Sequence, residues 1–170
     1  RHFGVSINYH QPYNAIRLVQ SGLVDSVQVI YNIFDQSPQD ELFAAAGANG
    51  VGVIVRVPLD EGALTGKITP ETTFPTGDWR NRYFGGDRKE QVQEHVRAIT
   101  ADLAVPVEHL PEIALRFCLS APEVSTVIPG MRSVRNVDAN VHAAELGPLS
   151  PAELDVLRRH RWVKNFYNAA

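Results

Sequence analysis

Residues suited to ligand binding, most of them polar, follow each of four short apolar runs in this sequence. In chain order they are Ser6 and Asn8, then Gln28 and Tyr31, then Arg56 with Pro58 and Leu59, and then Gly130 and Arg132. Sites in proteins with parallel strands lie at the carboxyl ends of the strands. Hydroxyl, amide and guanidinium groups form hydrogen bonds to polar heterocycles and phosphates, and none of them is a usual general base. The pattern therefore predicts a binding site and not a centre of acid–base catalysis.

The last of the four runs gives the sharpest prediction. Gly130, Arg132 and Ser133 stand between an apolar run and the start of a helical pattern. The N–H groups and the dipole of a helix N-terminus attract anions, and an arginine beside them can hold a phosphate through two parallel hydrogen bonds. The competing interpretation is a group of solvated residues that cap a surface helix.

The four apolar runs are the predicted strands: His2–Ile7, Ser26–Tyr31, Val51–Val57 and Ser125–Ile128. The first three are spaced at about 25 residues, the period of a strand, a helix and two turns. Val51–Val57 is almost wholly apolar, which is typical of a parallel strand covered on both faces. Helical patterns are expected at residues 9–20, 37–46, 89–103, 109–120, 133–145 and 150–160.

A long polar segment, Thr65–Arg88, separates the third strand from the next predicted helix. Loops of this length inside compact domains usually have a function, often as lids. Its aromatic residues Trp79, Tyr83 and Phe84 are expected either to line the mouth of a substrate site or to hold the loop in place.

Parallel β/α units of this kind form either an open doubly wound sheet of the flavodoxin type or a (β/α)8 barrel of about 250 residues. The chain has 170 residues, and its four units amount to half a barrel. The first strand also begins almost at residue 1. We therefore expect one domain over residues 1–170 that forms part of a longer gene product.

Composition excludes several classes of function. The net charge of −3 gives no general attraction to nucleic acid or to an anionic membrane. No apolar run reaches the roughly 20 residues that span a bilayer. The single cysteine, Cys118, excludes an internal disulfide and is expected to be a small buried side chain. We expect a cytoplasmic protein without a metal site.

Four blocks of the sequence resemble the second half of the aldo/keto reductases, strands 5 to 8 of that family's barrel. They are GVSIN (Gly4 to Asn8), SVQVIYNIFDQ (Ser26 to Gln36), VRVPLDEGALTGK (Val55 to Lys67) and STVIPGMRSVRNVDAN (Ser125 to Asn140). The resemblance implies an α/β fold, namely the C-terminal half of a (β/α)8 TIM barrel. It also implies an NADPH-dependent oxidoreductase that reduces aldehydes or ketones, a small-molecule carbonyl substrate, and a chain that forms the cofactor-binding half.

For the nicotinamide, the resemblance implies that Ser6, Asn8 and Gln28 hold the carboxamide. Many relatives have adjacent Ser and Asn residues, whereas Ile7 intervenes here. Arg56 stands where many relatives place a Tyr that stacks on the ring. Its charge would disfavour the oxidised, cationic nicotinamide. The alternative is that Arg56 pairs with an acidic residue at the rim of the barrel.

For the rest of the cofactor, the resemblance implies that backbone N–H groups of residues 58–62 surround the pyrophosphate, with Gly62 permitting close approach. A plain turn is the alternative. Leu59 and Leu64 would seat the adenosine linker, and Arg132 would bind a 2′-phosphate, which favours NADP(H) over NAD. The remaining predicted contacts are those of Gly130, Asn136 and Asn140 with the phosphate and the adenine edge.

The family's catalytic Asp, Tyr, Lys and His come from the first half of the barrel. The first lysine of this chain is Lys67, beyond the third strand. We therefore expect no catalytic residue in this chain. His10 is expected at the surface, and His95 and His142 as packing or surface residues. Asp60 and Glu61 are adjacent, so their side chains should point apart and not form a dyad.

Half a barrel leaves an apolar inner face and two strand edges open, which favours self-association. Two alternatives to the reductase remain. One is a non-catalytic nucleotide-binding or interaction subunit of the same fold, and the other is an unrelated flavodoxin-like domain.

Overall fold

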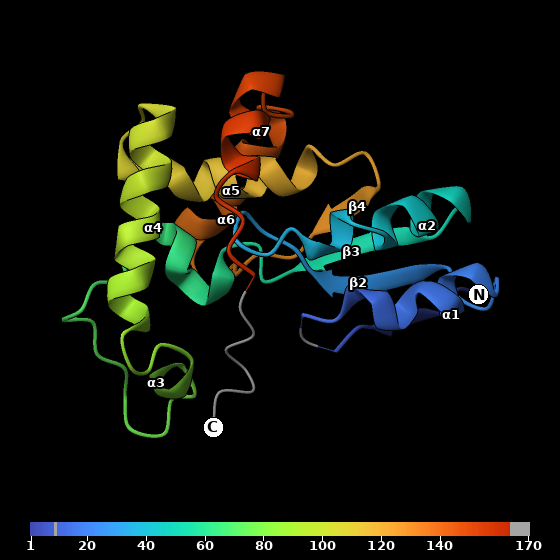
Figure 1. The fold of residues 1–170 in the computed structure, drawn as a ribbon, viewed down its shortest axis with the longest axis horizontal. Coiled ribbons are helices and arrows are strands. Elements are labelled where there is room, and N and C mark those ends of the chain that lie inside the picture. The colour runs from blue at the N-terminus through green and yellow to red at the C-terminus, as the bar shows by residue number, and fades with distance from the viewer. Residues whose placement is uncertain (9, 164–170) are drawn as a thin grey trace.

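A computed structural model describes residues 1–8 and 10–163 of the chain. Four strands form one parallel sheet in the order β1-β2-β3-β4, with bounds Gly4–Ser6, Ser26–Ile30, Gly52–Arg56 and Val124–Val127 (Figure 1). Each predicted strand is confirmed, with shifts of two residues or fewer at either end. The consecutive order differs from the 2-1-3-4-5 order of a flavodoxin-type sheet.

Seven α-helices accompany the strands in the described part of the chain. They are α1 (Ile16–Gln20), α2 (Leu42–Ala48), α3 (Arg80–Tyr83), α4 (Arg88–Leu103), α5 (Leu110–Leu119), α6 (Val134–Glu145) and α7 (Pro151–Arg158). The last four match the predicted helices closely. Proline explains part of the difference at the first two, because Pro12 and Pro38 open separate 3-10 turns there. The predicted start of the first helix, residue 9, lies outside the described residues.

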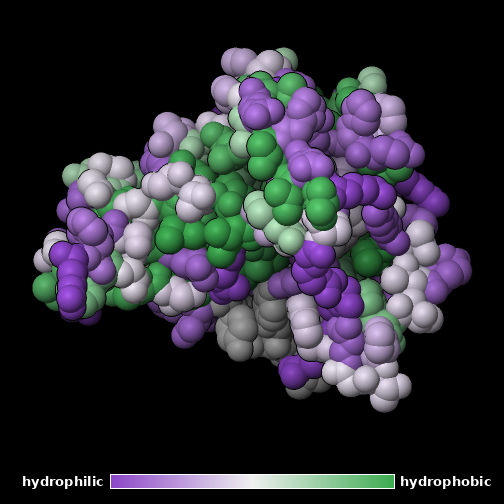
Figure 2. All heavy atoms as spheres, turned by 180° about the vertical axis from the view of Figure 1, so that it is seen from behind, coloured by the Kyte–Doolittle hydropathy of each residue, from purple (hydrophilic) through white to green (hydrophobic). Residues whose placement is uncertain are grey.

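One face of the sheet is packed and the other is open. Val27, Val53 and Val55 are fully buried in the core, whereas the alternate residues Ile54 and Arg56 are only half-buried. The prediction that the third strand is covered on both faces is therefore wrong for this chain. Figure 2 shows a broad hydrophobic surface near the middle of the molecule, seen from the side opposite to Figure 1.

The segment after β2 is joined to the end of the chain. The side-chain amide of Gln36 donates to the carbonyl oxygen of Leu157 across 2.9 Å, and the N–H of Trp162 donates to the carbonyl of Phe34 across 2.8 Å. Both contacts link residues more than 120 positions apart. Helix α7 and Trp162 therefore pack against the segment that follows the carboxyl end of β2.

Two local predictions are confirmed. Ser150 and Glu153 form a capping box at the start of α7, with Pro151 in the first turn. Cys118 is fully buried, its thiol lies 3.4 Å from the carbonyl oxygen of Tyr31, and burial raises the pKa of this thiol.

Among the helices of the described residues, none has the length and apolar character needed to cross a bilayer.

Candidate functional site

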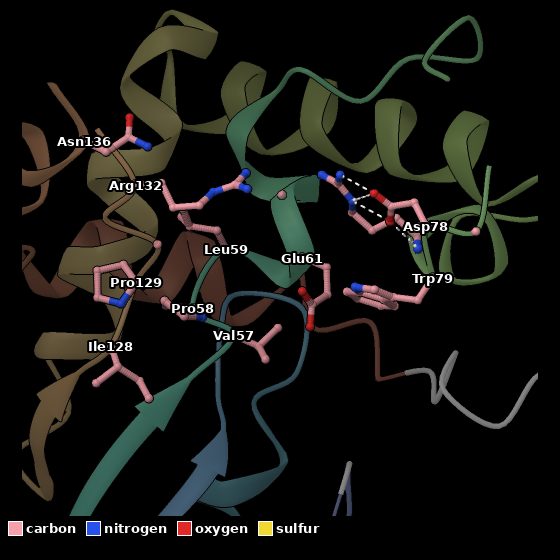
Figure 3. Close-up of a pocket in the computed structure, with 14 residues that line it drawn as sticks. Val57, Pro58, Leu59, Glu61, Asp78, Trp79, Ile128, Pro129, Arg132 and Asn136 are labelled. Atoms are coloured by element: carbon pink, nitrogen blue, oxygen red, sulfur yellow. Dashed lines mark hydrogen bonds and ion pairs between the residues drawn. The ribbon is translucent and has the colours of Figure 1, made fainter. Parts of the chain in front are cut away.

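The loops after β3 and β4 enclose a groove of about 790 Å³ (Figure 3). One wall is the loop after β3, a second is residues 77–80 of the long segment, and a third is the turn between β4 and α6. In Figure 1 the arrowheads of β2 and β3 point toward the side on which the long segment and α4 lie. The groove therefore occupies the carboxyl-end position where parallel β/α proteins bind ligands.

A second cavity of about 580 Å³ adjoins the groove. The two share Leu59, Gly130 and Asn136 as lining residues, and the second continues along α6 to Asn140. Lys67 and Arg135 also line it, so part of its wall is basic. Together the two cavities form a site long enough to hold a ligand of several linked parts.

Most of the predicted cofactor residues meet at these cavities. Those that line one or both are Pro58, Leu59, Gly62, Gly130, Arg132, Asn136 and Asn140. They come from two segments about 70 residues apart in sequence, brought together because β3 and β4 are neighbours in the sheet. Leu64, in contrast, is fully buried in the core and lines neither cavity, because the 3-10 turn Asp60–Thr65 turns it inward.

The loop after β3 uses some of its own N–H groups. The N–H of Asp60 donates to the carbonyl of Val57, and the N–H of Gly62 donates to that of Leu59, at 3.1 and 3.0 Å. Pro58 has no N–H. These groups hold the turn together, so fewer donors of residues 58–62 face a ligand than the sequence suggests.

The start of α6 has the features of an anion site. Ser133 is its N-cap, and the hydroxyl accepts from the N–H of Asn136 at 3.3 Å. The first turn carries no acidic residue. Arg132 is exposed and, in Figure 3, reaches from this turn toward the loop after β3. The side-chain amide of Asn140 donates to the carbonyl of Gly130 across 3.2 Å.

At the other end of the sheet edge, Ser6 and Gln28 are direct partners in the parallel register of β1 and β2. Ser6 and Asn8 are exposed and line a small separate pocket of about 160 Å³. Arg56 extends across from β3, and its Nη2 donates to the carbonyl oxygen of Ile7 at 3.0 Å. The arginine therefore binds a neutral carbonyl at this position and not a carboxylate of the rim.

An ion pair stands on the wall opposite α6. Arg80 binds the carboxylate of Asp78 through three hydrogen bonds of 2.6 to 3.2 Å. The side-chain and backbone N–H donors of Arg80 lower the pKa of Asp78 to about 2, and the charge of Arg132 acts in the same direction. Asp78 is thus an anion near Arg132, and it is balanced by its own arginine.

The aromatic residues of the long segment Thr65–Arg88 have two different roles. Tyr83 and Phe84 are buried, and Phe84 stacks on Phe74, so these rings hold the segment in place. Trp79 is 48% exposed and lines the groove. Tyr83 and Phe84 therefore follow the second alternative, and Trp79 alone of the three lines a cavity.

A buried polar cluster behind the groove was not predicted. Asp60 accepts hydrogen bonds from Tyr83 and Arg88 at 2.6 and 2.7 Å, and the ring of His10 binds Asp35. The side chain of His10 is almost fully buried, so the prediction that it lies at the surface is wrong. The partners lie 23 to 28 residues apart in sequence. The only signal for them in the sequence is the presence of polar residues among apolar ones, in NIFDQ and PLDEG.

The predictions for the Asp60–Glu61 pair and for His95 and His142 agree with the structure. Asp60 is buried while Glu61 lines the groove, so the pair is not a dyad. His95 packs between aromatic rings, and His142 is exposed. Among residues 1–8 and 10–163, no group of three or more His, Cys, Asp or Glu side chains is arranged to hold a metal ion.

The chain is similar to known proteins in sequence and in structure. The chain is 28% identical over 141 residues to the NADH-specific methylglyoxal reductase of Escherichia coli, covering 82% of this chain and 43% of that protein. It is 29% identical over 139 residues to a probable voltage-gated potassium channel subunit beta of Arabidopsis thaliana, covering 76% and 41%. The structure of an aldo-keto reductase from Bacillus halodurans in its holo form superposes with a TM-score of 0.69 at 26% identity, covering 95% of this chain and 50% of that one.

The chain thus spans about half the length of the proteins that it matches. The sequence model of the aldo/keto reductase family matches residues 1–161, nearly the whole of the chain. Together with the parallel β/α units and the groove at the ends of β3 and β4, this match shows that the chain belongs to the aldo/keto reductase family.

Proposed function

We propose that the chain is the C-terminal half of the (β/α)8 TIM barrel of an NADPH-dependent reductase that converts aldehydes or ketones to alcohols. Four consecutive parallel strands are half of an eight-stranded barrel, and the chain covers about half of its relatives. The sequence blocks that resemble strands 5 to 8 support the C-terminal position. The chain would then be the cofactor-binding half.

The observation that carries this proposal is the pair of adjoining cavities, with Arg132 lining the larger one and Gly130 and Asn136 lining both. Their volumes, about 790 and 580 Å³, lie within the range of roughly 300 to 1,000 Å³ that is usual for ligand sites. The charged side chain and the helix N-terminus suit a phosphate group. A 2′-phosphate bound there by Arg132 would leave the adenine along α6, beside Asn136 and Asn140.

The nicotinamide would then lie toward β1 and β2, where the hydroxyl of Ser6 and the amide of Gln28 hold its carboxamide and fix the ring face presented to substrate. NADPH, when bound, supplies the hydride for reduction of a carbonyl carbon. The part of this chain that the structure describes binds and orients the cofactor. The Asp, Tyr, Lys and His that complete the reaction would come from the other half of the barrel.

A cofactor titration tests the proposal. Trp79 lines the groove, so binding of NADPH should quench tryptophan fluorescence by energy transfer to the nicotinamide. We expect saturable binding of NADPH, at least tenfold tighter than that of NADH. An absence of binding by either nucleotide would overturn the proposal, and tighter binding of NADH would overturn the choice of NADP(H).

The second candidate is a non-catalytic nucleotide-binding or interaction subunit. One similar protein is named as a probable potassium channel subunit, so sequence similarity at this level does not require an enzyme. The oxidation of NADPH at 340 nm with an aromatic aldehyde, measured with the complete barrel, separates the two. Cofactor binding without turnover of carbonyl substrates favours the second candidate.

We further propose a cytoplasmic location and no nucleic-acid partner. The net charge of −3 and the single buried cysteine support both. The expected partners are a small carbonyl compound and, through the open face of the sheet, a second polypeptide surface.

A further inference from the structure

The loop after β3 has an unusual backbone. Val57, Asp60 and Glu61 have φ angles of 56°, 47° and 56°, and Gly62 follows at 106°. Residues other than glycine rarely adopt this left-handed region, because Cβ approaches the backbone too closely. Such conformations persist only where the surroundings over-determine them, and they concentrate at functional sites. Some specific contact must therefore hold this loop.

The side chain of Asp60 provides that contact. Its residue is 3% exposed, Oδ1 accepts from the hydroxyl of Tyr83 at 2.6 Å, and Oδ2 accepts from Nη2 of Arg88 at 2.7 Å. The same Nη2 donates to the Tyr83 hydroxyl at 3.2 Å, so the three groups close a triangle. A buried carboxylate with two strong donors is fixed in position.

The triangle joins the two walls of the groove from behind. Pro58, Leu59 and Glu61, the neighbours of Asp60 in the chain, line one wall. Tyr83 packs edge-to-face on Trp79 with ring centres 5.4 Å apart, and Trp79 lines the opposite wall. Asp60 itself does not line the groove, yet its carboxylate connects both sides.

We propose that Asp60 is a positioning residue for the pyrophosphate-binding part of the groove. Its bonds to Arg88 and Tyr83 hold the left-handed loop and the Trp79 wall at a fixed separation. This inference rests on the proposed cofactor site. It differs from that proposal because it concerns a residue that touches no part of the cofactor.

Two probes distinguish positioning from general stability. NADPH spans both cavities, whereas adenosine 2′-monophosphate carries only the part expected at Arg132 and α6. We expect Asp60→Asn in the full chain to weaken NADPH binding tenfold or more, while affinity for adenosine 2′-monophosphate changes less than twofold. A merely structural residue would weaken both equally. Equal loss for both probes, or unchanged NADPH affinity, overturns the inference.

Three further variants complete the test. Tyr83→Phe keeps the Asp60–Arg88 ion pair and removes one hydrogen bond to the carboxylate, so it should weaken the binding of NADPH alone, several-fold. It decides the matter if Asp60→Asn does not fold. The double variant Asp60→Asn with Arg88→Gln also removes the buried arginine charge that has lost its carboxylate, and it should recover part of the loss. Asp40→Asn removes an exposed ion pair with Arg161, neither of which lines either cavity, and should change neither affinity.

Failure of the unsubstituted chain to bind either probe would instead overturn the proposed function.

Discussion

The side-chain amide of Asn140 donates to the carbonyl oxygen of Gly130 across one turn of loop and two turns of α6. It fixes the turn that carries Arg132. We expect Asn140→Ala to lower the free energy of unfolding by about 1 kcal/mol, the usual net value of such a bond, and to weaken NADPH binding several-fold. Urea unfolding and fluorescence titration measure the two effects. Asn136→Ala, whose side chain is exposed, should weaken binding with no change in stability.

Arg132 is the residue expected to select NADP(H). Because a charge-assisted contact contributes about 1.5 to 3 kcal/mol, Arg132→Ala should weaken NADPH binding by roughly 10- to 100-fold and NADH binding by no more than about threefold. The matched control is Arg135→Ala, an exposed arginine three residues further along the chain that lines the second cavity and not the groove. A similar loss for both nucleotides would place Arg132 away from the 2′-phosphate.

Arg56 should set the balance between oxidised and reduced cofactor. Its guanidinium binds the neutral carbonyl of Ile7, near the proposed nicotinamide site. We expect Arg56→Gln to improve NADP⁺ binding relative to NADPH by about fivefold, corresponding to roughly 1 kcal/mol for a partly screened charge. The effect should diminish as salt is added. An unchanged ratio at low salt would contradict the prediction.

His95 should make stability depend on pH. It stacks on Trp162 with ring centres 4.0 Å apart, and burial lowers its pKa, with the charges of His160 and Arg88 acting in the same direction and Glu94 opposing them. The unfolded chain therefore takes up a proton at higher pH than the folded one. The stability that depends on neutral His95 is fully present above about pH 6.5, the pKa of this side chain in the unfolded chain. It is lost as the pH falls through the lower pKa that His95 has in the folded chain.

Urea unfolding at pH 7.5 and pH 5.5 measures this dependence. The midpoint of the natural chain should fall more between the two values than that of His95→Phe, which keeps an aromatic ring and cannot titrate. Equal shifts for the two proteins would assign the pH dependence to other groups.

The chain of residues 1–170 should self-associate. Several large apolar side chains at the end of β4 and on α6 are exposed, namely Ile128, Met131, Val134, Val137 and Val141. Exposed apolar surface favours association. Light scattering should give a mass well above that of one chain, and Val141→Glu should reduce it. A monodisperse monomer before substitution would contradict the expectation.

Sequence patterns predict the frame of this molecule well. Apolar runs such as Val51–Val57 mark the strands within two residues, because the alternate residues that face the core must be apolar. The grouping of Gly130 and Arg132 with Leu59 follows from the rule that parallel strands end at one edge. These predictions depend on local pattern and topology alone.

The contacts between side chains could not be predicted in the same way. Asp60 pairs with Arg88, 28 positions away, and His10 with Asp35, 25 positions away. Each of these residues also suits a solvated surface, and no periodicity distinguishes the two environments. The inward turn of Leu64 depends on the left-handed residues Asp60 and Glu61, a conformation that these residue types seldom adopt.

The hydrogen bond from Gln36 to Leu157 has to form between two distant parts of the chain. The buried amide of Gln36 donates to the nearby carbonyl of Ile33 and to the carbonyl of Leu157, which lies 121 residues further along the chain. Closing so long a loop is slow, since its entropy must be lost before the contact is gained. During synthesis, this contact is therefore expected to form only after α7 has left the ribosome.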